Sequence, residues 1–104
     1  MAIKNVFVAG AGLMGSGIAQ ACAASGLNVT LCDVDSGALE RATKNIAWSA
    51  GKFVEKGKIQ GPLEVILGRI TTTDDFSKAV GADLCIEAVF EKLDLKLEIL
   101  VRKG

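Results

Sequence analysis

The chain has 104 residues, with 12 basic and 12 acidic side chains, a formal net charge of zero and no histidine. Half of its residues are hydrophobic, so a chain of this length forms one domain whose core needs neither disulfides nor metal. A neutral chain lacks the basic surface that attracts nucleic acid or acidic lipid, and no apolar run is long enough to span a bilayer. We therefore expect neither a nucleic acid nor a membrane as a partner.

The start of the chain and its cysteines indicate the compartment. A strand that begins at Ile3 leaves no room for a signal peptide. Cys22, Cys32 and Cys85 fall in a predicted helix and two predicted strands, and their spacing matches no metal site. Unpaired cysteines in apolar elements typically serve as small buried hydrophobic side chains in a reducing environment. The sequence therefore predicts a cytoplasmic protein without a metal centre.

The first predicted strand, Ile3–Ala9, leads directly into a glycine-rich turn and a helix, Leu13–Ser25. The turn has the Gly-x-Gly-x-x-Gly pattern that places a pyrophosphate at the start of a helix, although an ordinary strand-to-helix turn is the alternative. Gly10 permits the tight turn, Gly12 lets backbone N–H groups approach the phosphates, and Gly15 lets the helix lie close to the strand. The candidate cofactor contacts in the turn are Gly10, Gly12, Leu13, Met14 and Gly15.

A second predicted strand, Asn28–Asp33, ends in a carboxylate about twenty residues after the turn. A carboxylate at this spacing accepts hydrogen bonds from a ribose 2′-hydroxyl and repels a 2′-phosphate. Asp33 is therefore the candidate ribose contact, and NAD is the predicted cofactor.

The next predicted element is a long helix that starts after Asp35 or Ser36 and ends near Lys56, where Gly57 stops it. About twenty residues at 1.5 Å each give about 30 Å, whereas a strand of six residues covers about 20 Å. The far end of the helix should therefore project beyond the sheet. Its apolar stripe consists of Leu39, Ala42, Ile46, Ala50 and Phe53.

A polar flank borders this stripe. It carries Asn45, Ser49, Lys52 and Lys56 at helical spacing. Such a flank suits a ligand that bears phosphate, although the spacing alone favours an ordinary solvated lysine face. Trp48 lies nearly opposite the stripe, so we expect it to be exposed unless something outside this chain covers it.

The remaining predicted elements alternate in the same way. They are a helical turn at Leu63–Leu67, a strand at Arg69–Thr73, a short helix at Phe76–Val80, a strand at Asp83–Ala88 and a helix from about Glu91 to Lys103. The last helix places Leu93, Leu97, Leu100 and Val101 on its inner face.

Alternation of strands and helices predicts an α/β fold, a Rossmann-like doubly wound parallel sheet with strand order 3-2-1-4. We expect this sheet to be truncated, with the long second helix projecting from it. The outer edge of the fourth strand would then lack a neighbour. A bare apolar edge promotes association or swapping between chains.

The carboxyl end of the fourth strand faces the cofactor cleft in a doubly wound fold. Ala88 and Val89 could pass beneath the nicotinamide, and Glu91 and Lys96 could supply polar contacts there. By position alone, Glu91 fits equally well as an acid in the first turn of a helix, and Lys96 as a surface charge.

Three segments and one aspartate resemble the N-terminal NAD-binding domain of the 3-hydroxyacyl-CoA dehydrogenase family. The likeness is strongest to its short bacterial members, the 3-hydroxybutyryl-CoA dehydrogenases. The segments and the aspartate are Gly-Ala-Gly-Leu-Met-Gly-Ser-Gly-Ile-Ala-Gln (10–20), Asp33, Lys-Phe-Val-Glu-Lys-Gly-Lys-Ile (52–59) and Ile-Glu-Ala-Val-Phe-Glu (86–91). The resemblance covers essentially the whole chain. It implies an oxidoreductase that interconverts L-3-hydroxyacyl-CoA and 3-ketoacyl-CoA with NAD, and a homo-oligomer for the full-length enzyme.

The resemblance also implies roles for individual residues. The three glycines would hold the pyrophosphate and Asp33 the adenosine ribose, while Ala88, Glu91 and Lys96 would line the nicotinamide side. The acyl-CoA substrate would meet the projecting helix at Ser49, Lys52 and Lys56, the flank found from helical spacing. The catalytic histidine of the family would lie beyond residue 104, so we expect this chain to carry no catalytic residue and to be inactive alone.

Three other interpretations remain open. The chain could belong to a related dehydrogenase that acts on a sugar acid, or it could be a non-catalytic NAD(H)-binding module or subunit. It could also be a structural domain whose glycine turn is vestigial. Protection of Lys52 and Lys56 by coenzyme A would distinguish the first interpretation from the acyl-CoA dehydrogenase.

Overall fold

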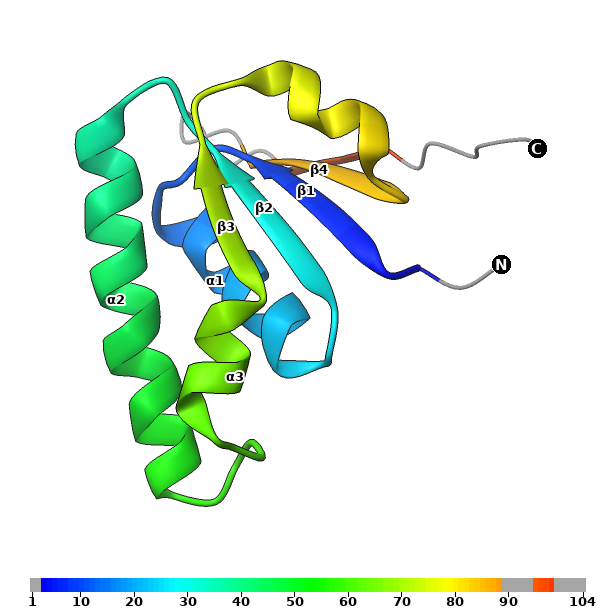
Figure 1. Cartoon of the computed structure of the whole chain (residues 1–104). Coiled ribbons are helices and arrows are strands. Elements are labelled where there is room, and N and C mark those ends of the chain that lie inside the picture. The colour runs from blue at the N-terminus through cyan, green and yellow to red at the C-terminus, as the bar shows by residue number, and fades with distance from the viewer. Residues whose placement is uncertain (1–2, 89–94, 99–104) are drawn as a thin grey trace.

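Alternating apolar strands and amphipathic helices build an α/β fold, described by a computed structural model for residues 3–88 and 95–98. The sheet has five strands in the order β3-β2-β1-β4-β5 (Figure 1). Its strands are β1 (Asn5–Ala9), β2 (Asn28–Cys32), β3 (Ile70–Thr73), β4 (Leu84–Ala88) and β5 (Leu95–Glu98). The helices are α1 (Leu13–Ala24), α2 (Ser36–Glu55), α3 (Leu63–Gly68) and the 3-10 helix η1 (Phe76–Gly81).

The strand order confirms the predicted doubly wound arrangement of the first four strands. β1 lies between β2 and β4 and is parallel to both, and β3 is parallel to β2. In this register Ala9 at the end of β1 lies opposite Cys32 on one side and Glu87 on the other. The carboxyl ends of the three strands therefore meet at one edge of the sheet, where the glycine turn begins.

The predicted last helix is wrong over Leu95–Glu98, which forms β5 antiparallel to β4. In Leu-Lys-Leu-Glu, apolar and polar residues alternate as they do in a strand, and Leu97 also fits the apolar stripe of a helix. The pattern alone therefore does not decide between strand and helix. Pairing with β4 satisfies backbone groups that the edge of that strand would otherwise expose. The prediction of a bare fourth strand is therefore also wrong, because β5 pairs with Cys85–Ala88. Glu91 and Leu93, which the predicted helix included, lie outside the described residues.

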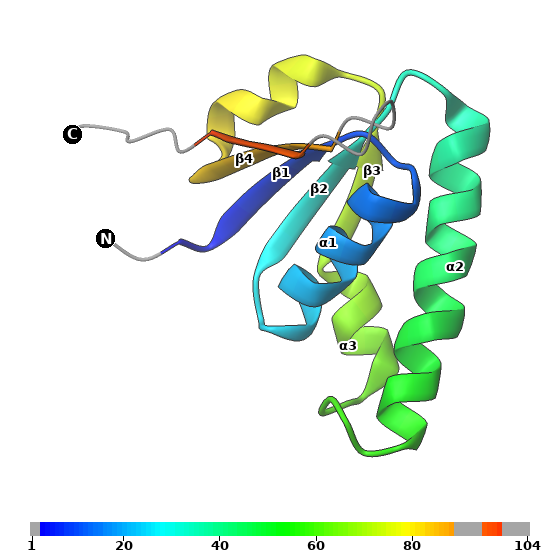
Figure 2. The ribbon, with the colours of Figure 1, turned by 180° about the vertical axis from the view of Figure 1, so that it is seen from behind.

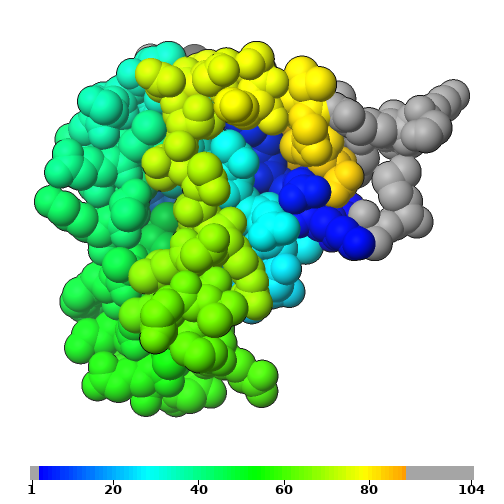
Figure 3. Space-filling view, viewed as in Figure 1, coloured from blue at the N-terminus to red at the C-terminus, as the bar shows by residue number. Residues whose placement is uncertain are grey.

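The two faces of the sheet are packed differently. Val6 and Val8 of β1 point into a core shared with α1, α2 and α3, whereas Phe7 points to the other face and stacks edge-on against Phe76 of η1. Figure 2 shows α1 and α2 side by side on the first face. On the other face, parts of β1 and β2 remain visible beneath η1 (Figure 3).

Helix α2 has the predicted stripe and the predicted projection. Asp35 caps it by accepting a hydrogen bond from the Gly37 N–H at 2.9 Å. Its 20 residues carry it past the ends of β2 and β3 (Figure 1). The stripe is buried at Ala42, Ile46 and Ala50, whereas Leu39 is half-buried and Phe53 is 40% exposed. Trp48 is 68% exposed, as predicted.

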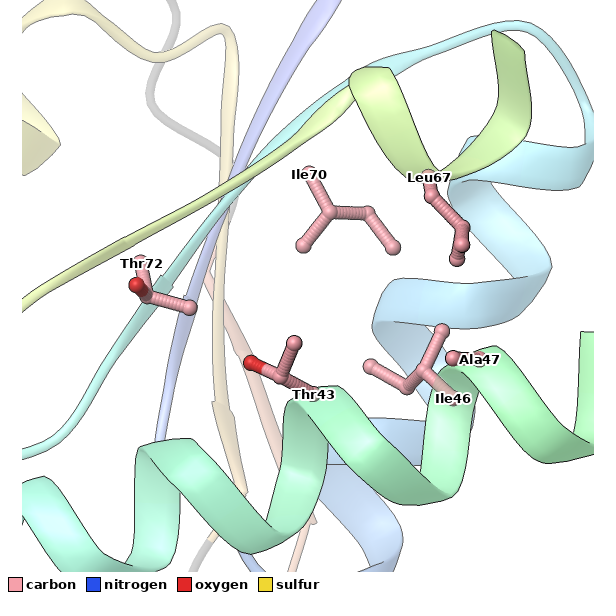
Figure 4. A pocket seen from close by; sticks show the side chains of 6 residues that line it. All are labelled: Thr43, Ile46, Ala47, Leu67, Ile70 and Thr72. Carbon is pink, nitrogen blue, oxygen red and sulfur yellow. The ribbon is translucent and has the colours of Figure 1, made fainter. Parts of the chain in front are cut away.

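A small cavity of about 150 Å³ lies between α2, α3 and β3 (Figure 4). Its lining residues are Thr43, Ile46, Ala47, Leu67, Ile70 and Thr72. None of these side chains ionises, so the cavity offers packing space rather than chemistry. In the described part of the chain, no helix is both long and apolar enough to cross a bilayer.

Candidate cofactor-binding site

The turn between β1 and α1 has room only for glycine at two positions. Gly10 has a φ of +109°, a conformation that other residues rarely adopt, and a Cβ there would overlap the carbonyl oxygen of Ala88. A Cβ on Gly15 would overlap the carbonyl oxygen of Gly10. Both predicted glycine roles, the tight turn and the close approach of helix to strand, are confirmed by this packing. The backbone therefore forms a closely fitted cradle.

The N-terminus of α1 opens onto this cradle without a side-chain cap. Gly12 is the N-cap residue, it makes no side-chain cap hydrogen bond, and the first turn contains no acidic residue. First-turn N–H groups have no intrahelical acceptors, and the helix dipole makes this end positive. Ser16 is buried and donates its hydroxyl to the Gly12 carbonyl at 2.8 Å, so it does not cap these N–H groups. This donor set suits a phosphate group.

Asp33 joins the end of β2 to the glycine turn. One carboxylate oxygen accepts the Ala11 N–H at 2.9 Å, and the other accepts the Asp35 N–H at 2.9 Å. The Gly10 N–H donates to the Cys32 carbonyl at 2.8 Å, so two hydrogen bonds tie the turn to β2. An anionic acceptor is thus held beside the uncapped N-terminus of α1, at the end of β2 where the sequence predicted it.

A cavity of about 460 Å³ extends from the turn along the start of α2. Its lining includes Ala11, Gly12, Leu13, Ser16, Asp33, Asp35, Arg41 and Asn45. Arg41 was not among the predicted site residues, although it lies four residues before Asn45 and therefore on the same flank of α2 as Asn45 and Ser49. The Arg41 guanidinium lies 3.7 Å from the Asp35 carboxylate, and both side chains are mostly exposed. The pair is worth little to stability, so the arginine can turn toward a ligand.

The cavity continues as a groove between α1 and α2. A second cavity of about 160 Å³ shares Leu13, Ser16 and Asn45 with the first. A third, of about 340 Å³, shares Gly17, Gln20 and Ser49 with the second and ends at Phe53 and Ile59. We call this path the α1/α2 groove. It connects the predicted cofactor end of the domain with the predicted polar flank of α2.

The structure brings most of the sequence-predicted site residues to this surface, but not all. Ser49 is half-buried in the groove, and Lys52 and Lys56 are exposed on the projecting part of α2. Ala88 lies against the glycine turn. The Lys96 backbone belongs to β5, opposite Glu87, and not to the predicted helix. Glu91 lies outside the described residues.

The cysteine beside the site is a buried thiol. Cys32 is fully buried, and burial, together with the negative charges of Asp33, Asp74 and Asp75, raises the pKa of its thiol. Burial likewise raises the pKa of Cys22 on α1. Both side chains therefore favour the neutral form, which is a poor nucleophile. Within the described residues, no three His, Cys, Asp or Glu side chains lie close enough to share a metal ion.

A parallel sheet of order 3-2-1-4, a glycine cradle at an uncapped helix N-terminus and an acidic residue after β2 define a dinucleotide-binding Rossmann domain. Residues 5–102 match the family model described as "3-hydroxyacyl-CoA dehydrogenase, NAD binding domain". The chain therefore belongs to this family, and its cofactor is NAD.

Known members of the family are similar over most of this chain. It is 40% identical to the probable 3-hydroxybutyryl-CoA dehydrogenase of Deinococcus radiodurans, over 93% of this chain and 35% of that protein. It is 37% identical to the mitochondrial hydroxyacyl-coenzyme A dehydrogenase of Sus scrofa, over 96% of this chain and 34% of that protein. The crystal structure of 3-hydroxybutyryl-CoA dehydrogenase from Escherichia coli matches 88% of this chain and 20% of that chain, with a TM-score of 0.80 and 35% identity. The chain thus spans about a third of the length of the two curated relatives.

Proposed function

We propose that this chain is the NAD-binding part of an oxidoreductase that interconverts L-3-hydroxyacyl-CoA and 3-ketoacyl-CoA. The Asp33 carboxylate, 2.9 Å from the Ala11 N–H and beside the uncapped start of α1, is the observation that carries the proposal. When bound, NAD supplies the acceptor for the hydride that leaves the hydroxyl-bearing carbon.

The cradle residues would bind the cofactor at two points. The first-turn N–H groups, from Leu13, Met14 and Gly15, would donate to the pyrophosphate, and Gly10 and Gly12 would let it approach the backbone. The Asp33 carboxylate would accept the ribose hydroxyls, and its charge would oppose the 2′-phosphate of NADP. Ala88, Glu91 and Lys96 remain the proposed nicotinamide contacts.

The acyl-CoA would lie along α2. The exposed ammonium groups of Lys52 and Lys56 and the half-buried hydroxyl of Ser49 would hold its phosphate-bearing end. Ser49 also lines the α1/α2 groove, which leads back toward the cofactor end of the domain.

The sequence contains no histidine, so no imidazole is present to exchange a proton with the substrate hydroxyl. We therefore expect the chain alone to bind ligands without oxidising NADH in the presence of acetoacetyl-CoA. Measurable turnover by the purified chain would contradict this expectation. The cytoplasmic location and the homo-oligomer of the full-length enzyme also remain predictions.

Isothermal titration calorimetry with NADH, NADPH and coenzyme A tests the proposal directly. We expect NADH to bind more tightly than NADPH because of the Asp33 charge, and coenzyme A to bind whether or not NADH is present. Binding of NADH without coenzyme A would favour a dehydrogenase for another substrate, such as a sugar acid, or a non-catalytic module. Equal affinity for NADH and NADPH would contradict the role assigned to Asp33.

A further inference from the structure

Trp48 is the one tryptophan of the sequence, and it lies on the solvent side of α2. It is 68% exposed, although large aromatic side chains normally contribute much of the buried area of a domain. The apolar stripe of α2 turns away from it, toward Ala42, Ile46 and Ala50, so the indole adds little to the core. The packing of the domain therefore does not account for this residue.

A lysine lies against the indole on the same side of α2. The Lys52 ammonium lies 5.8 Å from the centroid of the Trp48 ring. Lys56 follows one turn later, at the C-cap of the helix. Among the described residues, neither ammonium lies within ion-pair distance of a carboxylate. The surface thus combines an open aromatic plane with two cations that have no anionic partner.

An aromatic plane beside ammonium groups suits a nucleotide, because every base can stack on an aromatic ring while lysines neutralise phosphate. NAD at the glycine turn is not this ligand. Trp48 lies 13 residues along α2 from the cap Asp35, which corresponds to about 20 Å from the Asp33 end of the domain. The surface therefore fits a second ligand that carries its own adenine and phosphates, and coenzyme A has both.

We propose that Trp48 is the stacking platform for the adenine of coenzyme A, with Lys52 and Lys56 holding its phosphates. This inference rests on the proposed function, which places the acyl-CoA on this flank of α2. Ser49, the residue that follows Trp48, lines the α1/α2 groove, so the groove lies about 100° around α2 from the indole. Trp48 would then contribute to the preference for acyl-CoA over acyl groups on a carrier without adenine.

Fluorescence of the chain tests this contact without any label, because its emission excited at 295 nm comes from Trp48 alone. We expect coenzyme A and 3′,5′-ADP to quench this emission to a similar extent when NAD⁺ is already bound. Pantetheine, which lacks the nucleotide, should leave the emission unchanged. Adding NAD⁺ by itself should also leave it unchanged, because the dinucleotide binds at the other end of α2.

Calorimetry of variants measures what the contact contributes. Trp48→Ala should weaken coenzyme A binding about tenfold, whereas Trp48→Phe, which keeps a smaller ring, should weaken it by less. Lys52→Gln should also weaken binding, and Lys78→Gln, which removes one charge from η1 on the other face of the sheet, should not. NADH affinity should be the same in all four variants, which shows that each is folded.

The outcomes separate this proposal from the one on which it rests. Coenzyme A that binds with no quenching, and with equal affinity to the wild type and Trp48→Ala, would overturn the stacking role and leave the proposed function intact. Coenzyme A that does not bind at all would overturn both. Quenching by NAD⁺ equal to that by 3′,5′-ADP would assign the platform to adenine nucleotides in general and would also overturn the proposal.

Discussion

Replacing Asp33 with alanine should weaken the fold moderately and cofactor binding strongly. The carboxylate accepts two backbone N–H groups, each at 2.9 Å, from Ala11 and Asp35. A hydrogen bond to a charged group contributes about 1.5–3 kcal/mol. The bond to Ala11 is partly buried, whereas water can replace the exposed bond to Asp35. We therefore expect a loss of about 2 kcal/mol, which lowers the Tm of a domain of this size by about 8–15 °C.

The chain offers a matched control at the opposite end of the sheet. Asp83 also accepts two backbone N–H groups, from Lys4 at 2.9 Å and Asn5 at 3.0 Å, and both bonds are exposed. Asp83→Ala should lose less through these two bonds than Asp33→Ala loses through its own, because water can replace both of them. It leaves the glycine turn untouched, so NADH affinity should not change.

The decisive measurement is calorimetric NADH titration of both variants at 15 °C, where circular dichroism shows whether each is folded. Asp33→Ala should raise the Kd for NADH about 10- to 100-fold, because the ribose loses a charged acceptor. The Kd for NADPH should rise less, since the repulsion of the 2′-phosphate is also removed. A folded Asp33→Ala variant that binds NADH within twofold of Asp83→Ala would refute the reasoning.

Two further results should follow from the same structure. Gly15→Ala should cost about 1–3 kcal/mol and abolish NADH binding, because its Cβ overlaps the Gly10 carbonyl. Gly17→Ala, whose Cβ meets nothing, should raise stability by about 0.5–1 kcal/mol, and thermal unfolding with calorimetry compares the two. Iodoacetamide at pH 8, followed by mass spectrometry, should modify Cys32 at least about tenfold more slowly in the native chain than in urea, because burial raises the pKa of the thiol. Equal rates in both states would contradict that cause.

The sequence predicted the strands and helices up to residue 88 within a few residues, because local pattern and long-range packing agree there. The stripe of α2 fits only a helical period, and the short apolar run of β1 is identified as a strand by the glycine turn that follows it. The segment Leu95–Glu98 differs, because its pattern fits a helix and a strand equally well. Pairing with β4, which lies outside the segment's own pattern, decides the outcome.

The same distinction applies to the site. Gly10, Gly15 and Asp33 could be predicted because each fulfils a backbone or charge requirement that its spacing reveals. The bond from Ala11 to Asp33 could not, because Ala11 contributes only a backbone N–H, which every residue except proline has. The α1/α2 groove was also missed, since it arises from how two helices with small facing residues pack, and no single motif encodes that distance.

The place of β1 in the middle of the sheet has a consequence for synthesis. This strand leaves the ribosome before the other strands of the sheet, and β2 pairs with one of its edges early, but its other edge waits for β4. A nascent chain that has reached β3 thus displays an open edge of Val6, Phe7 and Val8, which is a point where it can pair with another chain. The Ala88 carbonyl that packs against Gly10 arrives with β4, so the glycine cradle is completed only after β1, β2 and β3 have been made.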